Sequence, residues 1–225
     1  MGHALERERL VIEEGDLSFW YRPRVVSAAD EQHPEDLGDV QRVLLALAPS
    51  GGSLFRLLAI GRKRLPRSGR NRFWGFVDLV LHDPRDMAAA LDAHTYNTRT
   101  RGLRHLPAAR PAAAGTYYLE QHDGHTHLVT SLTTSMDDDT VTRDLALEPR
   151  ASYIITVMNP DPAAWGLVEM PSLQYELFDE PEVHVPVPTP FPPELQERFE
   201  GRRYAQVDSP DWLNHPGAEL VFVSE

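Results

Sequence analysis

The sequence predicts an α+β fold whose main part is an antiparallel β-sheet, barrel-like or sandwiched, with a few short helices and a proline-rich extended arm. Three observations support this prediction. Several short segments are apolar on both faces and end in turn residues, which is typical of strands covered from both sides. One segment carries the strongest two-residue hairpin signal, Asp-Gly. Nine of the 19 prolines lie in residues 159–193.

Composition narrows the class of protein. The chain has 225 residues, 41% hydrophobic and 25% charged, as globular proteins do. We expect one domain over residues 1–225, because the last apolar segment looks like a strand that the sheet needs. There are no cysteines, which excludes disulfides and thiolate metal sites. No secretory signal is evident and no apolar run approaches the ~18 residues of a membrane span, so we predict a cytoplasmic protein.

The charge is strongly acidic but unevenly distributed. A net charge of −12 makes nucleic acid an unlikely main partner, because duplex binding depends on neutralising phosphates. The cations are almost all arginine, with Lys63 as the one lysine. Arginine suits carboxylate and phosphate ligands, although a bacterial-like, G+C-rich codon usage is the simpler explanation of the bias.

The first half of the chain reads mainly as strands. Residues 7–25 predict two strands, or one broken strand, around a turn at residues 13–16, and residues 27–39 an acidic loop. Three strands follow, at residues 40–48, 55–65 and 72–81. They are apolar on both faces, so we expect an antiparallel meander covered by a second sheet, by helices or by a partner subunit.

The later elements are shorter. Asp83, followed by proline and an acid, predicts a helix at residues 84–93. Residues 95–114 predict a long, irregular, basic loop. The remaining predictions are helices at residues 141–147 and 192–199, a helix cap at Ser209, and strands at residues 151–158 and 218–223.

Residues 159–193 form the clearest shift in composition. Alternating prolines at 186, 188 and 190 exclude a central strand. The segment also carries too many apolar side chains for a free linker. We therefore predict an arm that packs on its own domain or on a second subunit, which makes a homo-oligomer one of the expected states.

The Asp-Gly signal lies in residues 115–132. A two-residue turn at Asp123 places His122 opposite His125 and Glu120 opposite His127. Because side chains alternate with period 2, these three histidines and the glutamate share one face, and Leu119, Leu128 and Tyr117 share the other. The first face is the one cluster in the sequence that predicts chemistry.

Three imidazoles and a carboxylate can hold a divalent transition metal such as Zn or Fe. Opposed residues of an antiparallel pair have Cβ atoms ~4.5–5.5 Å apart, close enough for two rings to reach one ion. Residues 124–127, Gly-His-Thr-His, are similar to the HxH element of cupins. The glutamate that cupins place a few residues later is absent from residues 128–135, so Glu120 would have to supply the carboxylate.

Two arginine-rich segments predict an anion site. Arg62 and Arg64 lie in residues 61–72, and Arg99, Arg101 and Arg104 lie in residues 95–114. The second segment leads directly into the histidine hairpin, so its guanidinium groups are expected near the imidazoles. Guanidinium groups near the imidazoles would orient an anionic ligand. The alternative is that both segments are solvated loops that bind no ligand.

Three functions follow from these patterns. The first is binding of a metal ion or small anionic ligand by the histidine hairpin, with or without catalysis. The second is a non-catalytic module for protein–protein assembly, based on the doubly apolar strands and the arm. The third is binding of RNA or phosphate by the arginine-rich loops, where aromatic side chains alternate with arginine.

Overall fold

The computed structural model describes residues 9–24, 26–27, 34–61, 72–98, 102–122, 124–135, 140–145, 147–167 and 190–225. The strands are β1 (Leu10–Pro23), β2 (Val26–Ser27), β3 (Val40–Pro49), β4 (Phe55–Ile60), β5 (Arg72–Leu81), β6 (His94–Thr98), β7 (Gly102–Leu106), β8 (Arg110–His122), β9 (His125–Ser135), β10 (Arg150–Met158), β11 (Tyr204–Gln206) and β12 (Glu219–Ser224). The helices are α1 (Pro84–Leu91), α2 (Thr140–Leu145) and α4 (Pro193–Glu197), with 3₁₀ turns η1 (Leu37–Asp39), η2 (Pro162–Trp165) and η3 (Pro210–Asn214).

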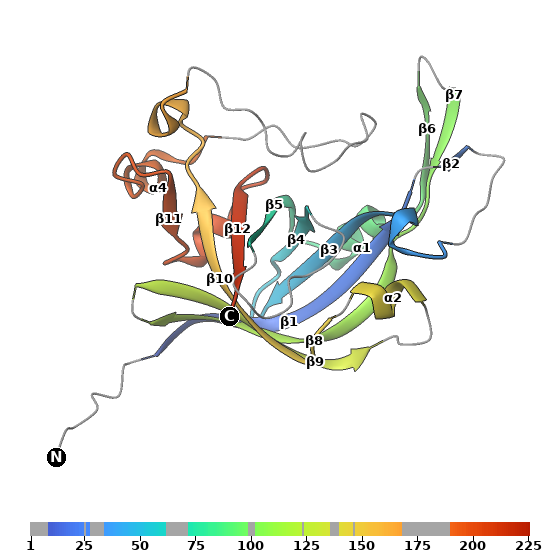
Figure 1. The fold of residues 1–225 in the computed structure, drawn as a ribbon, viewed down its shortest axis with the longest axis horizontal. Coiled ribbons are helices and arrows are strands. Elements are labelled where there is room, and N and C mark those ends of the chain that lie inside the picture. Colours follow the sequence, from blue (N-terminus) through green and yellow to red (C-terminus); the bar gives the residue numbers. More distant parts are fainter. Residues whose placement is uncertain are drawn as a thin grey trace.

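Eight antiparallel strands close into a barrel (Figure 1). The order around the barrel is β10-β12-β5-β4-β3-β1-β8-β9, and β9 pairs again with β10. Closure removes the free strand edges that an open sheet would expose. The prediction of a mainly antiparallel, barrel-like sheet is confirmed, and the α-helices described are three short pieces packed around it.

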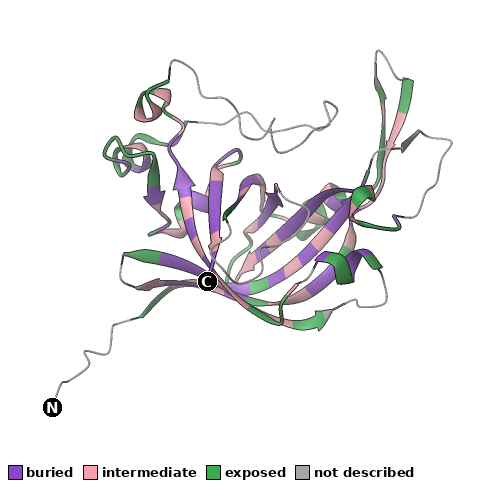
Figure 2. Ribbon diagram, in the orientation of Figure 1, coloured by how far each residue is buried: buried purple, intermediate pink, exposed green. Residues whose placement is uncertain are grey.

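The barrel strands are covered on both faces, as their sequences predict. Leu45 and Leu47 of β3 point into the interior core, whereas Leu44 belongs to a second apolar cluster on the outer face. That outer cluster includes Met87 and Leu91 of α1, which covers it. Burial therefore runs through successive residues of β3 and β4 instead of alternating (Figure 2).

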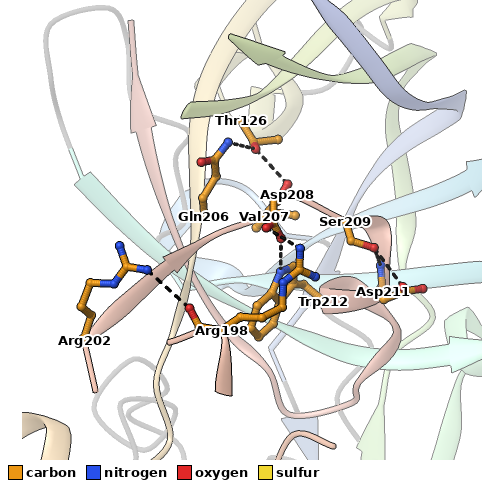
Figure 3. Close-up of polar contacts among 9 residues, drawn as sticks. All are labelled: Thr126, Arg198, Arg202, Gln206, Val207, Asp208, Ser209, Asp211 and Trp212. Atoms are coloured by element: carbon orange, nitrogen blue, oxygen red, sulfur yellow. Dashed lines mark hydrogen bonds and ion pairs between the residues drawn. The ribbon is translucent and has the colours of Figure 1, made fainter. Parts of the chain in front are cut away.

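The C-terminal segment is tied to the β8–β9 hairpin by polar contacts (Figure 3). The Thr126 hydroxyl donates to the Val207 carbonyl at 2.8 Å and accepts from Gln206 at 3.2 Å. Further along, the indole N–H of Trp212 donates to Asp208 at 2.8 Å, and Asp208 also pairs with Arg198. Trp212 is fully buried in the interior core, so η3 completes the packing of the barrel.

Two segments differ from the sequence prediction. The turn at residues 13–16 is absent: β1 is continuous, and Gly15 pairs with Pro49 on one side and Tyr117 on the other. Residues 95–114 are mostly strand, since β6 and β7 form a hairpin and β8 begins at Arg110. Long-range pairing overrides the local turn and loop composition in both places.

The last strand returns to the sheet as predicted, with β12 between β5 and β10. In the part of the chain that the structure describes, no helix has the length and apolar character needed to cross a membrane.

Candidate functional site

The β8–β9 hairpin has the predicted register. Glu120 pairs with His127, and His122 pairs with His125. Gly124 has φ 78°, the left-handed conformation that a tight Asp-Gly turn requires. The structure thus brings these four side chains to one face of the hairpin, on the outer side of the barrel.

The four side chains have different environments. His127 and Glu120 are 3% and 5% exposed, whereas His125 is exposed. The rings of His122 and His127 stack with centroids 4.5 Å apart and planes 9° apart. The in-plane lone pairs of two parallel rings lie in two separate, parallel planes, so they do not point at one shared position. The stacking therefore differs from the convergent arrangement that a shared ion needs.

Within the described ranges, no three His, Asp or Glu side chains are arranged to hold a metal ion. The metal site on His122, His125, His127 and Glu120 stays a prediction from sequence. Metal analysis of the purified protein, with His125→Ala/His127→Ala as control, tests it directly.

His127 makes its polar contacts through one ring nitrogen. Its Nδ1 lies 3.2 Å from Ser152 Oγ and 3.3 Å from Glu225 Oε2. A serine–histidine–acid triad needs the serine and the acid on opposite ring nitrogens. Here both share Nδ1, and Nε2 is buried without a hydrogen-bond partner among the described residues. This group of three residues is therefore not arranged for nucleophilic catalysis.

The buried His127 should make stability depend on pH. Burial lowers its pKa, opposed by Glu225 and reinforced by His122. The unfolded chain then takes up a proton near pH 6.5, before the folded protein does. The contribution of His127 to stability is complete above pH 6.5 and falls as the pH is lowered below it.

Urea unfolding between pH 7.5 and 5 checks this expectation. The His127→Gln variant should lose less stability than the wild type over this range, because its side chain does not titrate. His125→Gln, which changes an exposed position on the same strand, should keep the wild-type pH dependence. Equal slopes for the wild type and His127→Gln would contradict the assignment.

Among the described residues, one of the arginines predicted to bind an anion, Arg104, lies far from the histidine hairpin. Arg104 lies on β7, which rises from the end of β8 opposite to the β8–β9 turn (Figure 1). The 13 residues of β8 separate the two places by about 40 Å of strand, at ~3.3 Å per residue. Arg62, Arg64, Arg99 and Arg101 lie outside the described residues.

A cavity of about 620 Å³ lies elsewhere, on the outer face of the barrel. Its floor comes from β1, β3, β4 and β5, and its walls come from α1 and the β6–β7 hairpin. This volume falls in the range of ~300–1,000 Å³ that is typical of small-molecule sites. Most of the lining is apolar, including Leu44, Leu57, Leu79 and Leu106.

Two buried arginines line this cavity together with other polar residues, namely Gln41, Asp78, His94 and Tyr96. Arg22 is 6% exposed and donates to three backbone carbonyls, those of Ala90, Asp92 and Pro107, at 2.7, 3.2 and 2.6 Å. These contacts hold the C-terminal end of α1 against the barrel. Burial lowers the pKa of Arg22, although an arginine stays charged in proteins.

Arg42 is the second buried cation. It is 7% exposed, lies 3.6 Å from Asp78, and has its guanidinium 5.9 Å from the centre of the Phe76 ring. The sequence analysis predicted no binding role for either arginine, because the arginine-rich segments carried the stronger local signal. The available signal was a single arginine in each strand, which follows the aromatic residues 19–21 in β1 and precedes the apolar residues 43–48 in β3.

Comparison of the chain with protein-family models, with curated proteins and with solved structures finds no match in any of the three. The function is therefore inferred from the geometry of the cavity and of the histidine hairpin.

Proposed function

We propose that this protein binds a small organic molecule in the cavity on the outer face of the barrel. The observation that carries the proposal is an apolar cavity of about 620 Å³ that also holds buried polar side chains. Binding sites for small molecules combine a mainly apolar lining with a few placed polar groups. The barrel interior is a poorer candidate, because large side chains such as Phe19, Phe73 and Tyr117 fill it.

The cover of the cavity explains how a ligand would be enclosed. The helix α1 is held at its start by the Asp83 side chain, which accepts from the Arg85 N–H at 2.8 Å. Its end is held by Arg22. A short helix fixed at both ends gives a preformed wall, which lowers the ordering cost of binding.

A cavity-filling variant tests the proposal. Ala90 lines the cavity, so Ala90→Phe should obstruct it. Ala88 lies on the same helix and is exposed, so Ala88→Phe adds the same bulk away from the cavity. The probe is N-phenyl-1-naphthylamine, an uncharged fluorophore that brightens in apolar surroundings.

We expect saturable binding of one probe per chain by the wild type and by Ala88→Phe. Affinity should fall at least about tenfold in Ala90→Phe. Absence of saturable binding to the wild type, or an equal loss in both variants, would overturn the proposal.

We also retain the proposal that residues 159–193 form an arm on their own domain. The ends of this segment that the structure describes support it. Trp165 packs edge-on against Tyr204, with ring centroids 5.3 Å apart, and Phe191 is 6% exposed beside Trp212. Light scattering tests the alternative, since packing on a second subunit requires an oligomer.

A further inference from the structure

We propose that the β6–β7 hairpin, together with β2, is a lid that opens to admit the ligand of the outer cavity, and that Arg22 holds this lid closed. The inference rests on the proposed function and adds the element and the residue that control access to the same cavity. Three observations carry it: the lid is a separate sheet, it lies outside the apolar core, and Arg22 bridges its base.

The three strands of the lid form a sheet of their own. In the described part of the chain, β7 pairs with β6 and with β2, and no strand pairing joins these strands to the barrel. Figure 1 shows the hairpin rising away from the barrel. A lone hairpin is marginally stable in water, and β2 adds only two residues to it. Such a sheet costs less to displace than a strand of the closed barrel.

The lid supplies a wall of the cavity without belonging to the core. His94, Tyr96 and Leu106 line the cavity. None of the described residues of β6 and β7 belongs to either apolar core cluster. In contrast, Leu44 of the floor shares a cluster with Leu91 of α1. Displacing α1 would therefore break core packing, whereas displacing the lid would uncover the cavity and leave both clusters intact.

Arg22 lies at the base of the lid. Its guanidinium donates to the carbonyls of Asp92 and Pro107, at 3.2 and 2.6 Å. Asp92 lies two residues before β6 and Pro107 directly follows β7, so one side chain bridges both strands of the hairpin at its base. The bond to the Ala90 carbonyl, at 2.7 Å, ties the same point to α1. Arg22 also lines the cavity, so a bound ligand and the base of the lid meet at one guanidinium.

A closed lid slows both the entry and the release of a ligand, because the ligand passes only while the lid is open. Removing the bonds at the base should therefore raise the association and dissociation rate constants together and change the Kd less than either rate constant. A residue that only contacts the ligand would act differently: its loss would speed dissociation and leave association unchanged.

Hydrogen exchange of the ligand-free, full-length protein tests the lid without any probe. In Arg22→Gln, the amide hydrogens of residues 94–98 and 102–106 should exchange at least about tenfold faster than in the wild type, and those of β3 and β4 should not change. The control is Arg110→Gln. Arg110 begins β8, three residues after Pro107, and its side chain makes no hydrogen bond among the described residues. Equal acceleration in all strands, or none in the lid, would overturn the inference.

Stopped-flow binding of N-phenyl-1-naphthylamine separates the lid from the proposed function. Arg22→Gln should raise both rate constants several-fold, and Arg110→Gln should raise neither. Faster dissociation alone would make Arg22 a ligand contact and would overturn the lid. If the wild type binds no probe, the proposed function fails. If the probe binds but exchange in Arg22→Gln is unchanged, the lid fails and the proposed function stands.

A pair of spin labels keeps the inference falsifiable if Arg22→Gln does not fold. The chain has no cysteine, so Leu103→Cys and Thr116→Cys can be labelled selectively. Leu103 is 55% exposed on the lid, and Thr116 is exposed on β8. We expect two label-to-label distances without the probe and one distance when the probe saturates the protein. A single distance that the probe leaves unchanged would overturn the inference.

Discussion

Replacing Arg56 with methionine is expected to lower the free energy of unfolding by about 3–5 kcal/mol, the loss typical of removing one partner of a buried ion pair. The Arg56 side chain is 1% exposed inside the barrel. Its two terminal nitrogens donate to both carboxylate oxygens of Glu13, at 2.6 and 3.0 Å. Methionine replaces only the apolar part of the arginine side chain and leaves Glu13, whose side chain is 10% exposed, without its cation.

Other groups of the same network lose a partner in this variant. Arg56 Nε donates to the Asn214 side chain at 2.8 Å, which links β4 to η3. The Tyr117 hydroxyl donates to Glu13 at 2.8 Å, and burial together with that carboxylate raises the Tyr117 pKa far above its ordinary value. Tyr117 therefore stays neutral. Its hydroxyl still donates a hydrogen bond to Glu13 in the variant, but it does not replace the positive charge of Arg56.

Urea unfolding at pH 7.5 measures the loss. The control is Arg85→Met, which removes an exposed ion pair with Asp83 and should leave the unfolding midpoint nearly unchanged. The double variant Arg56→Met/Glu13→Leu should recover most of the lost stability, because it removes both charges. A loss below about 1 kcal/mol in Arg56→Met would show that the ion pair is not buried in solution.

Replacing Gly115 with alanine is expected to cost about 3 kcal/mol or more, at or above the upper end for overpacking of a protein interior. A Cβ atom at Gly115 would lie 2.0 Å from the Ser131 carbonyl oxygen and 2.7 Å from the Leu132 Cα atom. Both are backbone atoms of β9, so no side chain can move aside. The residue sits where the β8–β9 register shifts, between Ala114 and Gly115.

The matched control is Gly52→Ala in the turn between β3 and β4. Its added Cβ would meet nothing closer than the Leu54 nitrogen at 3.7 Å, an ordinary contact. We expect a change within about 0.5 kcal/mol of the wild type, as for most surface substitutions. Similar unfolding midpoints for the two alanine variants would contradict the close strand approach at Gly115.

Local sequence signals predicted several elements well. The three doubly apolar strands, the start of α1 at Asp83 and the register of the β8–β9 hairpin are confirmed. Each depends on residues close in sequence: a run of apolar side chains, a capping acid before proline, or an Asp-Gly turn. The capping acid and the Asp-Gly turn act through local backbone geometry, and a run of apolar side chains predicts burial whichever segment covers the strand.

Pairing between distant segments could not be predicted in the same way. Acidic and glycine residues at 13–16 suggest a turn, but Gly15 lies in a continuous strand because β3 and β8 pair on either side of it. The basic composition of residues 95–114 suggests a loop, but β6 and β7 pair as a hairpin. In both places the hydrogen bonds of neighbouring strands outweigh weak local preferences.

Residue patterns alone were enough to predict that this protein is β-rich, that its strands are covered on both faces, and that three histidines and a glutamate share one face of a hairpin. The closure of the strands into a barrel and the shared position of Arg22 and Arg42 in the lining of one cavity are seen only in the folded chain. The two kinds of feature differ in the range of the interactions that produce them. Side-chain alternation and turn chemistry are set by adjacent residues, whereas a cavity and its lining arise where segments far apart in the chain pack together.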